Sequence, residues 1–202
     1  MRLHESPTPN ARRVHIFMAE KGITCPRVRV DIRVGENIQT EYLSKNPAGR
    51  VPVLELDDGT FLAESVAICR YLEWLKPEPN LFGEPGIEAA TIEMWDRRAE
   101  LNFMANVASA FRNITGFFKD RETCVKEWGE ISAQAAGRFV GMFDTQLAKM
   151  EYLAGDRFSI ADITFVSAWD FAKSVKVVPL PEAPNVARWH GLIASRSSYK
   201  AE

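Results

Sequence analysis

The chain has 202 residues, of which 46% are hydrophobic and 26% charged, a balance typical of a folded globular protein with an ample core. Its net charge of −2 and the lack of any basic run exclude a general attraction to nucleic acid or to an anionic membrane. The three cysteines are widely spaced and form no metal-binding pattern, which indicates free thiols in a reducing compartment. No apolar stretch has the length of a membrane span or of a signal core, so we expect a cytoplasmic protein.

The first part of the chain alternates between strand and helix signals. A short strand over residues 3–5 is broken by a Ser-Pro-Thr-Pro-Asn turn. Apolar spacing then predicts a helix over 11–21, and Gly22 ends it. A second strand is expected over 28–32, while 33–44 is weakly helical or irregular.

A hairpin and a helix complete this part. Strands are predicted over 53–56 and 60–62, joined by Asp58-Gly59, which is a strong hairpin signal. A helix with one apolar stripe follows over 64–76. This order, βαβ followed by ββα, is that of a thioredoxin-like domain.

The second part of the chain has helical patterns only. Three prolines and two glycines over 77–86 predict a linker. Long helical patterns follow over 87–114 and 122–150, and a further helix is expected over 184–194. Between them, Ser159-Ile160-Ala161-Asp162 is a capping box in which Asp replaces Glu, and we assign it a structural role.

The predicted fold class is therefore an α+β thioredoxin-like domain followed by an all-α helical-bundle domain. The expected boundaries are 1–76 for the first domain, 77–86 for the linker and 87–202 for the helical domain.

Two short motifs in the first domain predict a ligand site. Pro52 lacks an N–H and suits the entrance of a strand, which leaves the backbone of Val51 free to pair with an extended peptide. Glu64 and Ser65 open a helix, where amides and the helix dipole favour an anion. Together they predict a site for a small peptide with a carboxylate and an amine. The alternative is a plain strand–turn–helix with a capping residue.

These motifs resemble the glutathione-binding half of cytosolic glutathione S-transferases, in particular a bacterial and fungal subgroup. The resemblance covers nearly the whole chain and rests on Asn46-Pro47-x-Gly49-x-Val51-Pro52-x-Leu54, Asp58-Gly59 and Glu64-Ser65-x-Ala67-Ile68. It implies a cis Val51–Pro52 bond, a backbone pairing of Val51 with the cysteinyl part of glutathione, and a Glu64–Ser65 pair that holds the γ-glutamyl end. Arg50 stands where many relatives contact the glycyl end.

The reaction that the resemblance implies is attack by a thiolate, which needs a hydrogen-bond donor near the sulfur. Ser6, Thr8 and Asn10 lie in the turn before the first helix and are the candidate catalytic residues, with Ser6 and Asn10 ranked ahead of Thr8 for contact with the sulfur. Thr8 or Asn10 could instead merely cap that helix. Arg12-Arg13 follow, and we expect them on a solvated face; the alternative is that they attract a glutathione carboxylate.

The second substrate implied by the resemblance is a small hydrophobic electrophile bound against the helical domain. The candidate pocket residues come from the first long helix. They are Phe103, Phe111, Arg112 and Asn113. Packing between helices is the alternative role of the two aromatic rings.

The expected function is conjugation of glutathione, as co-substrate and without a metal, to hydrophobic electrophiles in detoxification. One alternative is a glutathione-dependent disulfide reductase or peroxidase on the same fold. Another is a non-catalytic partner-binding protein of that fold. No nucleic acid or membrane partner is expected. The resemblance also implies a homodimer. Apolar residues such as Phe61 and Trp95 are candidates for the dimer interface, because we do not expect all of them to fit within the core of one chain.

Overall fold

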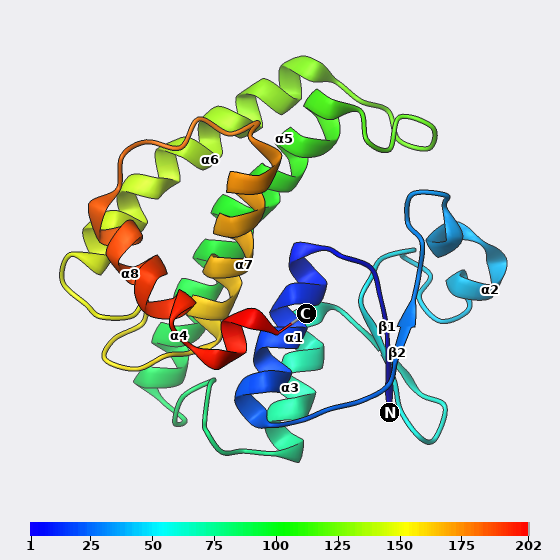
Figure 1. Ribbon diagram of the computed structural model, residues 1–202, viewed down its shortest axis with the longest axis horizontal. Helices are drawn as coiled ribbons and strands as arrows, with labels where there is room; N and C mark the ends of the chain where they lie inside the picture. The colour runs from blue at the N-terminus through cyan, green and yellow to red at the C-terminus, as the bar shows by residue number, and fades with distance from the viewer. Residues whose placement is uncertain (202) are drawn as a thin grey trace. The chain divides into compact units, whose positions relative to one another are not determined.

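The computed structural model describes residues 1–201 and separates into two compact units (Figure 1). The first unit comprises Met1–Asn80 together with the C-terminal segment from Ser197 on, and the second comprises Leu81–Arg196. The sequence placed that C-terminal segment in the helical domain, whereas its contacts belong to the first unit. Within residues 1–201, no helix is both long enough and apolar enough to cross a bilayer.

A four-stranded mixed sheet organises the first unit, in the order β2-β1-β3-β4. Strand β1 (Arg2–Glu5) runs parallel to β2 (Arg27–Arg29) and antiparallel to β3 (Val53–Glu55). Strand β4 (Phe61–Ala63) forms the predicted hairpin with β3. Strands β2 and β3 are shorter than the sequence indicates, β1 begins one residue earlier, and β4 is shifted by one residue. Their order along the chain and the hairpin are as predicted.

Two long helices, α1 (Pro9–Lys21) and α3 (Ser65–Leu75), lie side by side along the sheet (Figure 1). Gly22 ends α1 in the left-handed region, with φ 57°, as its position predicts. The irregular segment after β2 contains a 3₁₀ turn, η1 (Glu36–Ile38), and a single-turn helix, α2 (Thr40–Leu43). The fully buried side chains of this unit include Leu3, Val14, Phe17, Leu54 and Ile68.

The C-terminal turn η3 (Ser197–Lys200) packs against α1 of the same unit (Figure 1). The Arg12 guanidinium donates to the Tyr199 carbonyl over 3.3 Å and lies 4.7 Å from the centre of the Tyr199 ring. The Ser198 hydroxyl donates to the Glu20 carboxylate. The turn η3 therefore contacts α1 near both of its ends.

Among the described residues, the second unit consists of helices joined by loops, with one isolated β-bridge between Tyr152 and Gly155. Its elements are α4 (Ile87–Arg97), the π-helical segment η2 (Arg98–Met104), α5 (Ala105–Thr115), α6 (Lys126–Leu147), α7 (Ile160–Val175) and α8 (Pro184–Ala194). Elements α4, η2 and α5 follow one another without a break and correspond to the first predicted long helix. The thioredoxin-like and helical fold class is thus confirmed.

Helices α5 and α6 form a tightly packed pair (Figure 1). A Cβ atom on Gly129 of α6 would lie 2.8 Å from Ile114 Cγ1 and 2.9 Å from Asn113 Cβ of α5. Only a glycine allows this approach. Deeper in the unit, Trp95 is buried and its ring centre lies 6.2 Å from that of Phe143. The interpretation of Trp95 as a surface residue available to a dimer is therefore wrong.

The capping box at the start of α7 is present as predicted. The backbone N–H of Ser159 donates to Asp162 Oδ2 over 3.0 Å, and the Ser159 side chain accepts from the third residue of the helix. Asp162 has no exposed surface. The motif is structural, and it joins α7 to the rest of the second unit.

Candidate functional site

Strand pairing brings the two predicted motifs and the first turn to one edge of the sheet. His4 of β1 lies opposite Val53 of β3, and Val53 lies opposite Ala63 of β4. Because both pairs are antiparallel, the end of β1, the beginning of β3 and the end of β4 meet. The turn after β1, the Val51-Pro52 dipeptide and the Glu64-Ser65 dipeptide therefore share this edge.

The Val51–Pro52 peptide bond is cis, as the resemblance implied. The loop before it is held by side chains from the irregular segment. Tyr42 Oη and Asn46 Nδ2 both donate to the Arg50 carbonyl over 2.9 Å. Burial raises the pKa of Tyr42 well above its usual range, which keeps the phenol protonated as a donor. Strand β3 begins only at Val53, so Val51 precedes the sheet ladder.

Glu64 has an unusual backbone for a residue with a side chain. Its φ is 66° and its ψ is 113°, in a region that L-residues seldom occupy and that costs about 1–3 kcal/mol. It is the residue before α3, yet its carboxylate makes no capping bond and is exposed. Such geometry presents the Glu64 carboxylate to solvent beside the free amides of the first turn of α3.

Ser65 lies below that surface and contacts α1. Its side chain is buried, and Arg13 Nη1 donates to Ser65 Oγ over 2.6 Å. Arg13 Nη1 also donates to Asn10 Oδ1 over 3.3 Å. The Arg13 side chain has no exposed surface, so its predicted place on a solvated face is wrong. The sequence gives no signal for this contact, because a basic residue at the start of a helix is usually exposed.

The turn after β1 places the three candidate donors differently. Thr8, not Asn10, is the residue before α1, and its Oγ1 accepts from the Ala11 N–H over 3.2 Å. Asn10 is the second residue of α1, and its carbonyl oxygen faces Arg13 and Ser65. Ser6 is buried, with 5% of its surface exposed. Of these three residues, Thr8 alone has a partly exposed hydroxyl group. Its oxygen accepts the capping hydrogen bond, so its proton can still be donated to a ligand.

The four residues of the predicted electrophile pocket are also in different settings. Phe103 is fully buried among aromatic rings, with centres 5.5 Å from Phe165 and 6.0 Å from Trp169, so it forms part of the core and offers no surface to a substrate. Phe111 is partly exposed and packs against Phe117 and Phe171, with ring centres 5.2 Å and 5.4 Å away.

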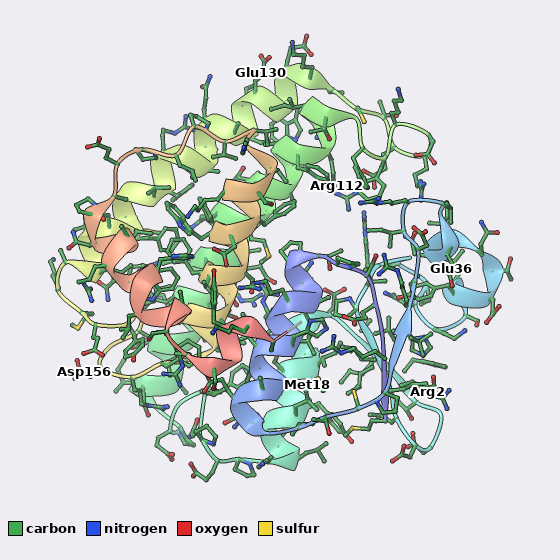
Figure 2. All side chains as sticks on the ribbon, viewed as in Figure 1. Arg2, Met18, Glu36, Arg112, Glu130 and Asp156 are labelled. Carbon is green, nitrogen blue, oxygen red and sulfur yellow. The ribbon has the colours of Figure 1, made fainter. Side chains whose placement is uncertain are left out.

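Figure 2 shows Arg112 on α5, near the loop that follows this helix. Arg112 and Asn113 each bind a residue of the segment between α5 and α6. Arg112 is paired with Glu122 and lies 4.6 Å from the centre of the Phe118 ring. Asn113 Oδ1 accepts from the Val125 N–H over 2.8 Å. These contacts give both residues a structural part in the second unit.

Comparison with known proteins agrees with the fold and the motifs. The profile described as "Glutathione S-transferase, N-terminal domain" matches residues 3–80, and that of the C-terminal domain matches residues 125–197. The chain is 38% identical to Glutathione S-transferase 2 of Saccharomyces cerevisiae over 99% of this chain and 88% of that relative.

Two further similarities bear on function. The crystal structure of a glutathione S-transferase domain-containing protein from Marinobacter aquaeolei matches with a TM-score of 0.94 and 37% identity, covering 99% of this chain and 100% of that one. Elongation factor 1-gamma of Prunus avium is 34% identical over 84% of this chain, but only 40% of that relative is covered.

Proposed function

The chain belongs to the glutathione S-transferase family, and we propose that it binds glutathione and joins the glutathione sulfur to small hydrophobic electrophiles. The observation that carries this proposal is the edge of the sheet at which Val51-Pro52, Glu64-Ser65 and the N-terminus of α1 meet. A peptide bound there could pair with the backbone of Val51, bind the exposed Glu64 carboxylate and accept hydrogen bonds from the N-terminal amides of α1 and α3.

Each part of glutathione has a matching group in this arrangement. Glu64 takes the γ-glutamyl amine, and Ser65 with the first amides of α3 takes the neighbouring carboxylate. The backbone of Val51 pairs with the cysteinyl residue as a strand would. Arg50 is exposed, and its guanidinium can bind the glycyl carboxylate through two parallel hydrogen bonds.

We place the cysteinyl sulfur at the N-terminus of α1, beside Thr8. A free thiol has a pKa of about 8.5, and lowering it by about two units requires roughly 2.7 kcal/mol of stabilisation of the thiolate. A hydrogen bond to a charged group supplies about 1.5–3 kcal/mol, and a helix N-terminus adds about 0.3–1 kcal/mol. The Thr8 hydroxyl and the N–H groups of the first turn are therefore sufficient, and no protein base is required.

Replacement of Thr8 by alanine is expected to raise the pKa of the bound glutathione thiol by about 1–2 units, which corresponds to the loss of one hydrogen bond to the thiolate. Ultraviolet absorbance of the thiolate, followed against pH in the complex, measures this value. Thr8→Ser keeps the hydroxyl and should titrate like the wild type, as should Ser6→Ala. If Thr8→Ala also titrates like the wild type, the donor is instead a backbone amide of this turn.

In the conjugation step the thiol proton leaves to water, and the sulfur electron pair forms a bond to an electrophilic carbon. With an aryl halide as the electrophile, the bond from carbon to the halide then breaks and halide is released. We propose that the electrophile contacts the partly exposed ring of Phe111 and its neighbours Phe117 and Phe171. Phe103 has no place in this pocket because it is buried in the core.

Turnover of a chloronitrobenzene with glutathione tests the proposed reaction, and turnover of hydroxyethyl disulfide tests the reductase alternative. We expect the first to exceed the second. The opposite result would assign the protein to disulfide reduction at the same site. If the chloronitrobenzene is the better substrate, a panel of electrophiles would identify the class that the protein conjugates.

A second candidate function is a non-catalytic role in partner binding on the same fold, since the chain also resembles part of a protein named as an elongation factor, elongation factor 1-gamma. Retention on a glutathione column, with elution by free glutathione, separates the two functions. A scaffold without a ligand site would not be retained.

We further propose a homodimer in the cytoplasm. The free cysteines suit a reducing compartment. Apolar side chains are exposed on both units, including Phe61, Trp74 and Leu75 on the first and Met94 and Leu101 on the second. Light scattering at micromolar concentration is expected to give twice the 22.8 kDa mass of one chain. A mass equal to that of one chain would contradict the dimer.

A further inference from the structure

We infer that Arg13 is a positioning residue, which holds the Ser65 hydroxyl so that its proton points toward the carboxylate of a γ-glutamyl ligand. The inference rests on the proposed function, because it concerns the part of the glutathione site formed by Ser65. It adds a residue of α1 to that site, and this residue does not itself contact the ligand.

The hydrogen bonds around Ser65 fix the direction of its hydroxyl. Arg13 Nη1 donates to Ser65 Oγ over 2.6 Å, so the oxygen acts as an acceptor on the side of α1. The hydroxyl must then donate in another direction. The protein acceptor that it reaches is Asn10 Oδ1, at 3.5 Å, which is a long contact. A ligand carboxylate at the N-terminus of α3 would be the stronger acceptor, since it is charged.

The charge of Arg13 strengthens this arrangement. Its side chain has no exposed surface, so its field is less screened than that of a surface arginine. A ligand carboxylate, the Ser65 hydroxyl and the guanidinium would form a chain of two hydrogen bonds with opposite charges at its ends. In such a chain each bond polarises the next.

The geometry also indicates why arginine occupies this position. One nitrogen, Nη1, lies 2.6 Å from Ser65 Oγ and 3.3 Å from Asn10 Oδ1, so the guanidinium links Ser65 of α3 to Asn10 of α1. A lysine would bring a point charge without the planar donor set that holds this orientation. We therefore expect the site to select ligands that carry a free α-carboxylate beside the α-amine of a γ-glutamyl group.

The test is calorimetric titration with two ligands. One is reduced glutathione, and the other is its analogue in which a 4-aminobutyryl group replaces γ-glutamyl, so that only this carboxylate is missing. Arg13→Met should weaken glutathione binding about tenfold or more, the effect expected for one hydrogen bond to a charged group. It should change the affinity for the analogue less than about twofold. In the Ser65→Ala background, Arg13→Met should have little further effect on glutathione affinity.

Arg12→Met is the matched control, because Arg12 contacts Tyr199 and not Ser65, and it should bind both ligands like the wild type. Arg13→Lys is a second variant should Arg13→Met fail to fold, and it should also lose selectivity for glutathione over the analogue. Equal losses for the two ligands in the Arg13 variants would overturn the inference and leave Arg13 a purely structural role. Failure of the wild type to bind glutathione would instead overturn the proposed function.

Discussion

Replacement of Asp162 by alanine is expected to lower the free energy of unfolding by about 3–5 kcal/mol. Asp162 Oδ1 accepts from the Leu153 N–H over 3.0 Å and from Trp189 Nε1 over 2.9 Å. Asp162 Oδ2 accepts from the Ser159 N–H and hydroxyl over 3.0 Å and 3.2 Å. Alanine would leave these buried donors without an acceptor. Asp162→Asn should cost about 1–3 kcal/mol, since its NH₂ group must face one pair of donors.

The pH dependence of stability offers an independent check on Asp162. Burial raises its pKa from 3.8 to about 6, against the opposing effect of the hydrogen bonds that it accepts. The folded state therefore holds a proton that the unfolded state releases between these values, so this residue makes stability fall as pH rises from about 4 to about 6. The fall amounts to about 3 kcal/mol at 1.36 kcal/mol per unit.

Denaturant unfolding of wild type and Asp162→Asn at several pH values isolates this contribution as a difference between the two curves. The advantage of the wild type should shrink as pH rises through this range and stay constant above it. A difference that does not change with pH would show that Asp162 remains ionised throughout.

The second large effect is expected at Lys21, whose ammonium group is buried at the end of α1. Its Nζ lies 2.6 Å from Glu73 Oε2 of α3 and donates to the Pro77 carbonyl over 2.9 Å and to the Pro79 carbonyl. Lys21→Met would leave the Glu73 carboxylate without this cation in a buried site, which typically costs about 3–5 kcal/mol.

Thermal or denaturant unfolding measures this loss. Lys76→Met, at an exposed lysine nearby, is the control and should change stability by less than about 0.5 kcal/mol. The double variant Lys21→Met with Glu73→Gln should be more stable than Lys21→Met alone, because no buried carboxylate remains. If Lys21→Met is as stable as the wild type, the buried Lys21–Glu73 pair does not contribute to the stability of the protein.

Local signals in the sequence predicted much of the fold. The helix expected over 184–194 has those bounds in the structure, and Gly22 ends α1 where its left-handed preference indicates. The hairpin at Asp58-Gly59 and the capping box from Ser159 to Asp162 were also predicted from the sequence, because the residues that form each of them lie within a few positions of one another. The Val51–Pro52 cis bond followed from resemblance alone.

Contacts between distant residues were not predictable in the same way. Arg13 meets Ser65 across 52 positions of the sequence, and neither residue type signals the other. In the sequence, Lys21 resembles any lysine in the last turn of a helix, and nothing indicates that its ammonium group pairs with Glu73. The π-helical segment from Arg98 to Met104 shares its apolar spacing with an ordinary helix, so the periodicity did not reveal it. The second cis bond, Glu78–Pro79, had no signal beyond its linker composition.

The proposed function depends on glutathione binding at the edge of the sheet where Val51, Glu64 and Ser65 meet. Calorimetric titration of the wild type, Glu64→Ala and Ser65→Ala with reduced glutathione tests it most directly. We expect saturable binding by the wild type with one site per chain. Ser65→Ala should weaken that binding by about 1–2 kcal/mol, the scale of one hydrogen bond to a charged group. Wild-type affinity in both variants, or no binding by the wild type, would contradict it.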